Sequence, residues 1–135
     1  MLARDLMTPD VVTLDTGATI ADAVALVTEH EIRHVPILDD DRLVGIISDR
    51  DLRRIEGLLA QDIANPERSE NVLGSPVTAL ISRHPVTCAV ETHVDEVIDL
   101  LVMEGVGAVV VCDGGAIAGI ISVLDVLEAA RGRLG

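Results

Sequence analysis

The chain has 135 residues, 10 of them basic and 23 acidic, which gives a formal charge of −13. That charge excludes generic binding to a nucleic-acid backbone, and the absence of Phe, Tyr and Trp excludes base stacking on aromatic side chains. No apolar run approaches the roughly 18 residues of a membrane span, and residues 1–30 lack the apolar core of a signal peptide, so we expect a cytoplasmic protein without membrane or nucleic-acid partners.

The first half of the chain predicts a strand, a helix, two strands and a second helix. Thr19 and Asp22 form a T-x-x-D capping box, and the apolar residues that follow have helical spacing. Two aliphatic runs on either side of the turn Asp39-Asp40-Asp41-Arg42 have the composition of strands. The expected elements are strand Val11–Leu14, helix Ile20–His30, strands Val35–Leu38 and Leu43–Ser48, and a helix from Ser48 toward Leu59.

The second half predicts the same order of elements. Its strands are expected at Val86–Cys88, Ala108–Cys112 and Ile117–Ser122, with helices near Val94–Glu104 and Val123–Arg131. Between the halves, residues 60–75 are polar and contain the breaker Gly74-Ser75-Pro76, so we interpret them as a linker. Pro76 to Ser82 is expected as a short helix that matches Leu2 to Thr8.

An internal repeat explains this symmetry. Gly45-Ile46-Ile47-Ser48 recurs as Gly119-Ile120-Ile121-Ser122, an offset of 74 residues, and the same offset aligns residues 12–54 with residues 86–128 without a gap. One copy of about 50 residues is marginally stable alone, whereas two copies packed through their sheets bury a common core. We therefore expect an α/β (α+β) fold with two β-α-β-β-α copies related by a pseudo-two-fold axis, at residues 1–59 and 76–135.

The cysteines and histidines predict no metal site. Cys88 and Cys112 lie opposite Leu14 and Leu38 in the repeat, so we interpret both cysteines as small apolar side chains. His30 and His34 form an i,i+4 pair, but Pro36 follows closely, and we do not expect the two histidines to share a helix. No metal and no resident cofactor are expected.

The duplicated unit resembles the cystathionine β-synthase (CBS) domain, and two units in tandem resemble a Bateman module. The motifs that carry the resemblance are Met7-Thr8-Pro9, Arg33-His34-Val35-Pro36-Ile37 and the twice-occurring G-I-I-S-x-x-D. The resemblance covers about Leu2 to Ala130, which implies a stand-alone module with no attached enzyme. It also implies an energy-sensing regulatory protein, not an enzyme, that binds AMP, ADP, ATP or S-adenosyl compounds such as S-adenosylmethionine in clefts between the copies.

The resemblance further implies which residues bind the ligand. Asp accepts the ribose hydroxyls, Ser at a helix N-terminus contacts phosphate, and backbone beside the first strand reads adenine. One site would combine Ser122 and Asp125 with Val12, Thr13, Arg33 and His34. The other site would combine Ser48, Arg50 and Asp51 with Val86 and Thr87. Because Gly107 and Ala108 stand opposite Arg33 and His34, we expect the Asp125 site to prefer the more highly charged ligand.

Simpler interpretations of the same residues stay open. Ser48 with Asp51, and Ser122 with Asp125, also satisfy a capping box that requires only a helix. Arg33 and His34 fit an exposed strand edge, and Arg50, Arg53 and Arg54 fit a solvated helix face, which we prefer for the last two. The Asp39–Asp41 run fits a hairpin turn, and Gly45 and Gly119 fit positions where another backbone comes close.

The function expected from the sequence is therefore a sensor that signals when its ligand reorients the copies or the dimer. The resemblance implies a homodimer formed through helices, with Val97-Leu101 and Val123-Val126-Leu127 as candidate contacts. The alternative is a structural dimerisation or scaffold module with empty clefts, and an enzyme acting on nucleotides is a weaker third possibility. The acidic excess without lysine also indicates a halophilic origin, with codon bias in a GC-rich genome as the alternative.

Overall fold

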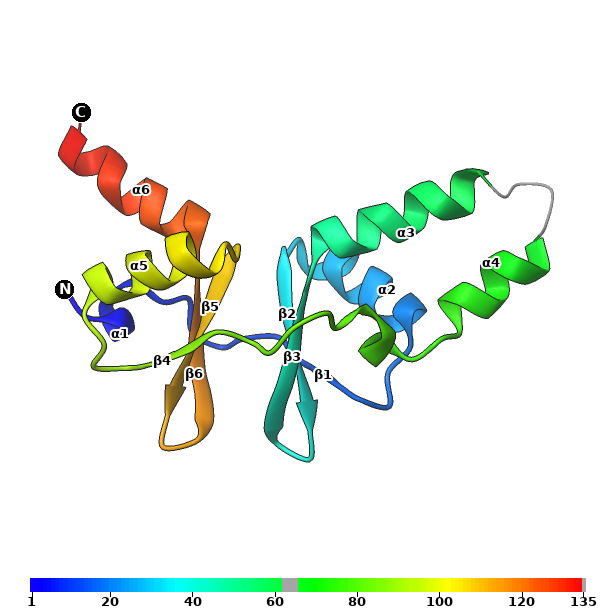
Figure 1. The fold of residues 1–135 in the computed structure, drawn as a ribbon, viewed down its shortest axis with the longest axis horizontal. Coiled ribbons are helices and arrows are strands. Elements are labelled where there is room, and N and C mark those ends of the chain that lie inside the picture. Colours follow the sequence, from blue (N-terminus) through cyan, green and yellow to red (C-terminus); the bar gives the residue numbers. More distant parts are fainter. Residues whose placement is uncertain (62–65, 135) are drawn as a thin grey trace. The chain divides into compact units, whose positions relative to one another are not determined.

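The computed structural model describes residues 1–61 and 66–134, and the chain divides into two compact units. One unit is Val12–His84, and the other combines Met1–Val11 with the chain from Pro85 onward. Each unit contains one three-stranded sheet with its helices (Figure 1). The sequence copies predicted at residues 1–59 and 76–135 therefore do not coincide with the compact units, because residues 1–11 and 76–84 lie with the opposite copy.

The unit Val12–His84 confirms the predicted β-α-β-β-α order of the first copy. Its sheet has the order β1-β2-β3, with β1 parallel and β3 antiparallel to the central strand. The Thr19–Asp22 capping box starts the first helix as predicted: the Thr19 amide donates to Asp22 Oδ2 at 2.8 Å and the Asp22 amide donates to Thr19 Oγ1 at 3.2 Å. The elements are β1 (Leu14–Asp15), α2 (Ile20–His30), β2 (His34–Asp39), β3 (Arg42–Ser48), α3 (Asp49–Gln61), α4 (Pro66–Leu73) and the 3₁₀-helix η1 (Val77–Leu80).

The second unit repeats this order, with a short helix in front of it. Strand register is the same in both sheets at the offset of 74 residues: His34 pairs with Ser48 and Ala108 with Ser122. Both hairpins also have a register shift at the same place, between Ile37 and Leu38 in the first copy and between Val111 and Cys112 in the second. The elements are α1 (Ala3–Leu6), β4 (Thr87–Ala89), α5 (Val94–Glu104), β5 (Ala108–Asp113), β6 (Ala116–Ser122) and α6 (Val123–Leu134).

The first strand of the first copy is shorter than predicted, and Pro36 explains the difference. In the second copy, the Val110 amide donates to the Val86 carbonyl at 3.0 Å and β4 begins at Thr87. Pro36 is the equivalent of Val110 and has no amide proton to donate to Val12. The prediction of a strand over Val11–Leu14 was therefore wrong at its start, and Val12 and Thr13 precede β1.

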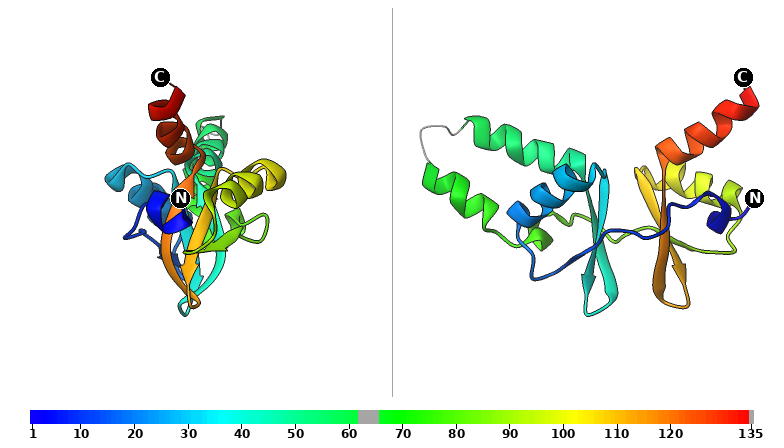
Figure 2. Two further views of the ribbon diagram at one scale, coloured as in Figure 1. Left: turned by 90° about the vertical axis from the view of Figure 1, so that its left-hand side faces the viewer. Right: turned by 180° about the vertical axis from the view of Figure 1, so that it is seen from behind.

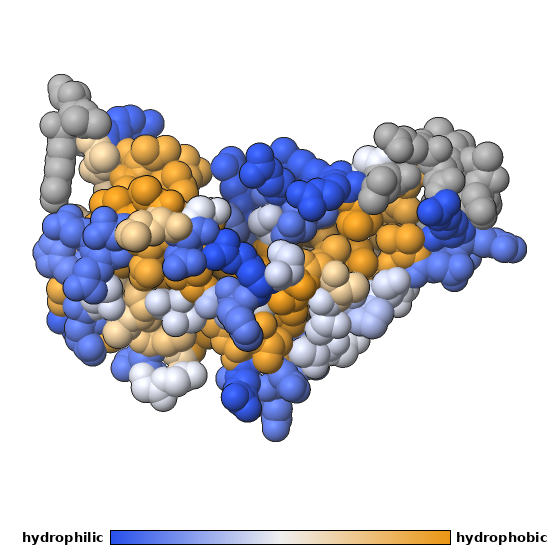
Figure 3. Space-filling view, in the orientation of Figure 1, coloured by the Kyte–Doolittle hydropathy of each residue, from blue (hydrophilic) through white to orange (hydrophobic). Residues whose placement is uncertain are grey.

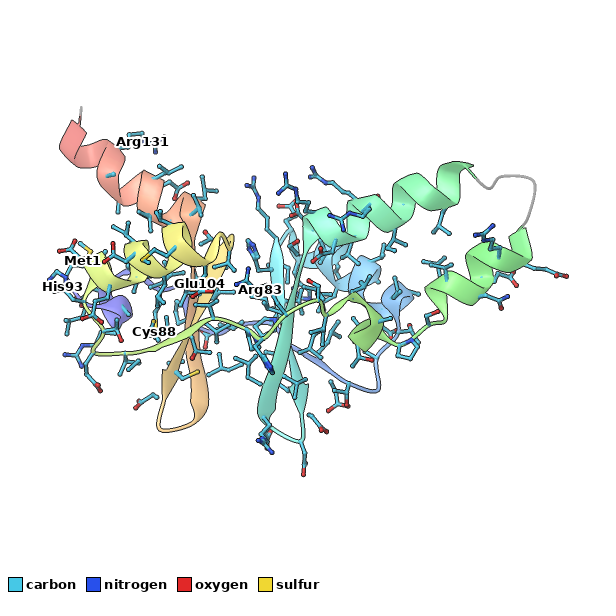
Figure 4. The ribbon with its side chains drawn as sticks, in the orientation of Figure 1. Met1, Arg83, Cys88, His93, Glu104 and Arg131 are labelled. Atoms are coloured by element: carbon cyan, nitrogen blue, oxygen red, sulfur yellow. The ribbon has the colours of Figure 1, made fainter. Side chains whose placement is uncertain are left out.

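The segments in front of the two copies are exchanged between the units. The Ala3 amide donates to the Thr92 carbonyl at 2.7 Å, and the Val94 amide donates to the Met1 carbonyl at 3.0 Å. Figure 4 shows Met1 and His93 side by side at the start of α5, and the right view of Figure 2 shows the N-terminus in this unit. The equivalent bonds in the other unit run from the Val77 amide to the Ala18 carbonyl and from the Ile20 amide to the Ser75 carbonyl.

The segment predicted as a linker, residues 60–75, contains helical structure that the sequence did not indicate. Residues 62–65 lie outside the described residues, but α3 continues to Gln61 and α4 occupies Pro66–Leu73. Proline is tolerated in the first turn of a helix, and Leu73 packs against the core of its unit. A polar segment with one apolar stripe can therefore form a surface helix where its composition alone suggested a loop.

Each unit has its own apolar core under its sheet. Val35, Ile37 and Ile47 are fully or almost fully buried in one unit, and Val109, Val111 and Ile121 hold the equivalent places in the other. Val97 and Leu101 also belong to the second core, so their prediction as a dimer contact was wrong. Val97 and Leu101 lie on the apolar stripe of α5, and this stripe packs against the core of their own unit. No described helix is long and apolar enough to cross a membrane.

Candidate functional site

The candidate site of the first copy is the turn from β3 into α3, where Ser48 and Asp51 form a reciprocal box. The Ser48 amide donates to Asp51 Oδ2 at 2.9 Å, and the Ser48 hydroxyl donates to the same oxygen at 3.1 Å. The Asp51 amide in turn donates to Ser48 Oγ at 3.3 Å. Both side chains are half-buried, so the turn holds the carboxylate in a fixed orientation while its Oδ1 atom takes no part in the box.

The turn from β6 into α6 has the same geometry in the second copy. The Ser122 amide donates to Asp125 Oδ2 at 2.8 Å, and the Asp125 amide donates to Ser122 Oγ at 3.2 Å. Ser122 and Asp125 are also half-buried. The capping interpretation of both motifs is therefore confirmed, and it is compatible with ligand binding because a carboxylate has further acceptor sites on its second oxygen.

The first-turn amides of both helices are partly engaged within their own unit. The Asp49 amide donates to the Arg33 carbonyl at 2.8 Å, and the equivalent Val123 amide donates to the Gly107 carbonyl at 3.0 Å. Together with the Ser–Asp box, these bonds occupy the first and third helical amides. The amide between them, that of Arg50 in α3, is the one positioned to meet an anion at this helix start.

The surroundings of the two turns differ in charge. Exposed Arg50 follows Ser48 in the first copy, and His34 lies directly across the β2–β3 ladder from Ser48, so their side chains share one face of the sheet. In the second copy the equivalent residues are Leu124 and Ala108. The turn at Asp51 therefore carries basic side chains from its own unit, and the turn at Asp125 has none at these two positions.

The remaining predicted site residues are divided between the units. Val12 and Thr13 are half-buried in the unit that contains Asp51, and half-buried Val86 and exposed Thr87 lie in the unit that contains Asp125. Within each unit the structure brings the Ser and Asp together, and in one unit it adds His34 and Arg50. The predicted combination of residues from both copies into one site stays a prediction.

Arg33 lies in a polar groove that the sequence did not indicate. This groove, of about 340 Å³, is lined by residues of α2, of the turn that follows α2 and of α3, and its apolar lining residues are Val24, Val27, Ile32 and Leu52. Arg33 lines the groove together with three acidic side chains of its own unit, and its predicted contact with a ligand stays a prediction. The polar residues that line the groove are Thr28, Glu31, Arg33, Asp49, Arg53 and Glu56.

The groove also shows one ion pair that was missed. Arg53 Nη2 lies 3.4 Å from Asp49 Oδ2, and the Arg53 side chain is 78% exposed. The exposure confirms the solvated interpretation of Arg53, and it limits the contribution of the pair to stability to a few tenths of a kcal/mol. The signal was present in the sequence, because opposite charges at i and i+4 on a helix are neighbours.

The two cysteines have the character of apolar side chains. Burial raises the pKa of the Cys88 thiol, and the neighbouring Cys112 raises it further, while a hydrogen bond with Thr92 acts in the opposite direction. Burial also raises the pKa of the Cys112 thiol. Cys88 packs against the core, as predicted for the equivalent of Leu14. Within the described part of the chain, no three His, Cys, Asp or Glu side chains form a metal-ligand set.

Comparison with known proteins identifies the family of both copies. Residues 3–57 and 77–132 each match the CBS domain. A CBS domain-containing protein of Dictyostelium discoideum is 28% identical over 130 residues, which cover 95% of this chain and 90% of that protein. The matches to other curated relatives cover between 13% and 42% of the length of those proteins, and some of them carry the names of enzymes.

Solved structures agree with the family match. CBSX2, whose structure was determined in complex with AMP, is 25% identical with a TM-score of 0.76, and the match covers 99% of this chain and 98% of that chain. The CBS domain pair of protein MJ0100, solved with 5′-methylthioadenosine and S-adenosyl-L-methionine, shares the fold at 24% identity with a TM-score of 0.80, over 98% of both chains. The chain therefore belongs to the CBS domain family and contains two copies of this domain.

Proposed function

We propose that the chain is a regulatory module that binds an adenosine nucleotide or derivative through the Ser–Asp turns at Asp51 and Asp125. The observation that carries this proposal is the repeated geometry of those turns, in which a half-buried carboxylate is anchored through one oxygen at a helix start. A ribose diol needs an acceptor in a fixed orientation, which the second oxygen supplies. A CBS protein that covers nearly the whole chain binds AMP, which supports the adenosine class.

The two turns are proposed to differ in the ligand that they prefer. The Asp51 turn offers Arg50, the Arg50 amide and a neighbouring His34, a set that suits a phosphate. The Asp125 turn lacks these basic side chains in its own unit. The predicted preference of the Asp125 site for the more highly charged ligand requires Arg33 and His34 to join it, and that combination remains a prediction.

The experiment is a calorimetric titration of the purified protein with AMP, ATP and S-adenosylmethionine. Asp51→Asn and Asp125→Asn keep an acceptor oxygen for the cap but remove the charge and the second acceptor oxygen. We expect each variant to lose binding at one site by about ten-fold or more, because a carboxylate that accepts ligand hydroxyls contributes about 1.5–3 kcal/mol. Circular dichroism checks that each variant folds.

The chain supplies a matched control for this experiment. Thr19 and Asp22 form a box of the same geometry at the start of α2, outside the Ser–Asp turns. Asp22→Asn should cost the same small amount of stability and leave nucleotide binding unchanged. If all three Asn variants bind nucleotide like the parent protein, Asp51 and Asp125 act only as caps and the assignment is wrong.

The alternative remains a structural dimerisation or scaffold module, which the confirmed capping role of both Ser–Asp pairs favours. It predicts no heat of binding with any of the three nucleotides. Without Trp or Tyr the protein absorbs weakly in the near ultraviolet, so an adenine band in the purified protein would argue against it. We propose a non-enzymatic role, and turnover of added nucleotide in chromatography would contradict it. The cytoplasmic location and the homodimer stay predictions, and nucleotide binding as proposed depends on neither.

Regulation by this module requires that the ligand distinguish two states of the chain. A ligand that binds both states equally shifts nothing, however tightly it binds. The proposal therefore includes a change in the chain or in its homodimer that nucleotide binding favours. Hydrogen exchange with and without saturating AMP measures this change. If exchange were identical outside the Ser–Asp turns, the protein would bind the nucleotide without changing state, and the regulatory part of the proposal would be wrong.

A further inference from the structure

The groove around Arg33 contains apolar surface that its own unit leaves partly open. It is lined by α2, the turn after α2 and α3, and we call it the α2–α3 groove. Its volume of about 340 Å³ is near the lower end of the range for small-molecule sites. One of its aliphatic lining residues, Leu52, is buried, and the other three are half-buried: Val24, Val27 and Ile32. A ligand that covered these three side chains would remove more apolar surface from water.

Charged side chains of both signs line the same groove. Glu31 and Arg33 lie two positions apart on the turn after α2, and Glu56 lies on α3. Within residues 1–61 and 66–134, none of these three side chains forms an ion pair, whereas the lining residues Asp49 and Arg53 pair with each other. Opposite charges that share a groove without touching can be bridged by a ligand that carries both signs. The groove therefore suits a zwitterion with an apolar body.

The second copy keeps the apolar lining of the groove and lacks its charges. At the offset of 74 residues, the aliphatic lining residues correspond to Ile98, Leu101, Val106 and Val126. The six polar lining residues correspond to residues without charge, namely Val102, Gly105, Gly107, Val123, Leu127 and Ala130. Figure 3 shows hydrophilic residues over the first half of α3 and hydrophobic residues over the start of α6, the equivalent helix. The apolar lining therefore serves the fold of both copies, whereas the charges are specific to the first copy.

Glu31 holds its charge at a backbone position that favours glycine. It is the C-cap of α2 with φ 52°, and the second copy has Gly105 with φ 64° at the equivalent C-cap. A left-handed backbone costs a residue with a Cβ more free energy than it costs glycine. Residues in such conformations gather at binding and catalytic sites, where the function offsets the strain. The Glu31 carboxylate is therefore the charge of this groove for which a role in binding is best supported.

We propose that the α2–α3 groove binds a free α-amino acid with an aliphatic side chain. The Arg33 guanidinium donates to its carboxylate, and the Glu31 carboxylate accepts from its ammonium group. These two residues lie two positions apart on one turn, which matches a ligand whose two charged groups share one carbon atom. The side chain of the ligand covers Val24 and Val27. A peptide terminus offers only one of the two charges. The proposal goes beyond nucleotide binding and does not rest on it.

The first test is equilibrium dialysis of the purified protein against labelled L-leucine, up to millimolar concentration. We expect saturable binding of one leucine per chain, because the second copy lacks the charges. Glycine should compete about ten-fold less well or worse, since it has no side chain to cover the aliphatic lining. Isoamylamine and isocaproate each keep that side chain but only one charge, and each should compete about five-fold less well or worse. No binding of leucine, or equal competition by either analogue, would overturn the proposal.

The second test changes the charges of the groove. Glu31→Gln and Arg33→Gln should each weaken leucine binding by about five-fold or more. The matched controls, Glu29→Gln on α2 and Arg54→Gln on α3, make the same changes of charge at exposed positions outside the groove. Both controls should bind leucine like the parent protein, and circular dichroism checks that all four variants fold. An equal loss in variants and controls would mean that only net charge matters, and the proposal would be wrong.

Titration of Glu31→Gln with AMP separates this site from the proposed nucleotide site. Glu31 is not among the predicted nucleotide contacts, so this variant should lose leucine binding and keep the affinity of the parent protein for AMP. A parent protein that binds leucine but no nucleotide would leave this proposal standing while the proposed function fails. If AMP displaced leucine competitively, the two ligands would share one site and a separate site in the α2–α3 groove would be wrong.

Discussion

The side chain of Met7 lies directly on Gly119, where an added Cβ would come within 2.6 Å of the Met7 Sδ. Gly45 has the same relationship to Ile81, whose Cδ1 would lie 2.5 Å from the added atom. Next to Gly119, the Thr8 backbone pairs with Ile120 through two hydrogen bonds of 2.9 and 3.0 Å. The sequence predicted that another backbone comes close to these two glycines. At Gly119 the Thr8 backbone lies beside the neighbouring residue Ile120. In both copies, however, the atoms that leave no room for a Cβ belong to a side chain, that of Met7 or Ile81.

Gly119→Ala should therefore destabilise the protein by about 1–3 kcal/mol, because the Met7 side chain is contacted from its Cβ outward and cannot simply move aside. The measurement is urea unfolding followed by circular dichroism. Adding Met7→Ala should recover part of the loss. Gly57→Ala in α3 is the control, since no atom lies within 4 Å of its added Cβ, and it should gain up to about 1 kcal/mol.

Three left-handed positions of the first copy carry residues with a Cβ, of which Asp tolerates this conformation better than Glu. Glu31 has φ 52°, Asp40 φ 49° and Asp41 φ 68°, while the second copy has glycine at all three equivalents. Glu31→Gly, at the C-cap of α2, should raise the free energy of unfolding by about 0.5–1 kcal/mol by removing the Cβ conflict. Glu29→Gly within the same helix should lower it by a similar amount. If Glu31→Gly instead lowered the free energy of unfolding, the interactions of the Glu31 side chain in the groove would stabilise the protein by more than its left-handed backbone conformation destabilises it.

Stability should fall at alkaline pH because of the cysteines. The raised pKa of the Cys88 thiol means that folding favours the neutral form, so this contribution is complete below the ordinary thiol pKa and is lost as pH rises through the folded value. The chain has no Lys and no Tyr to titrate in the same range. Urea unfolding between about pH 8 and pH 10 should show the loss. Cys88→Leu, the residue of the first copy, should reduce it; an unchanged slope would exclude Cys88 as the cause.

Salt should stabilise the protein. Raising sodium chloride from about 0.1 to 1 M shortens the screening length from about 10 to 3 Å and weakens the repulsion within a chain of charge −13. We expect the thermal midpoint to rise, and to rise less in a variant in which Asp39, Asp40 and Asp41 are changed to Asn. A midpoint independent of salt would favour codon bias over a halophilic origin as the reason for this composition.

Much of the candidate site was predictable because it is local. The Ser48–Asp51 and Ser122–Asp125 boxes join residues three positions apart, and a helix start is enough to form them. The ion pair between Asp49 and Arg53 is equally local, because opposite charges four positions apart on a helix are neighbours. The groove around Arg33 was not predictable in this way, since its residues come from two helices and the turn after the first one, which only packing brings together.

The sequence by itself determined the duplication, the β-α-β-β-α order of each copy and the residues that begin its helices, because capping and periodicity depend on neighbours within one or two turns. Only the tertiary structure decided that Ala3 bonds to Thr92 while Val77 bonds to Ala18, which exchanges the leading segments between the copies. It alone also decided that Val97 is buried and Leu127 exposed, although both lie on apolar helix stripes. The physical reason is that the burial of an apolar helix stripe depends on which segments, distant in the sequence, pack against it. The spacing of apolar residues along one helix does not specify those segments.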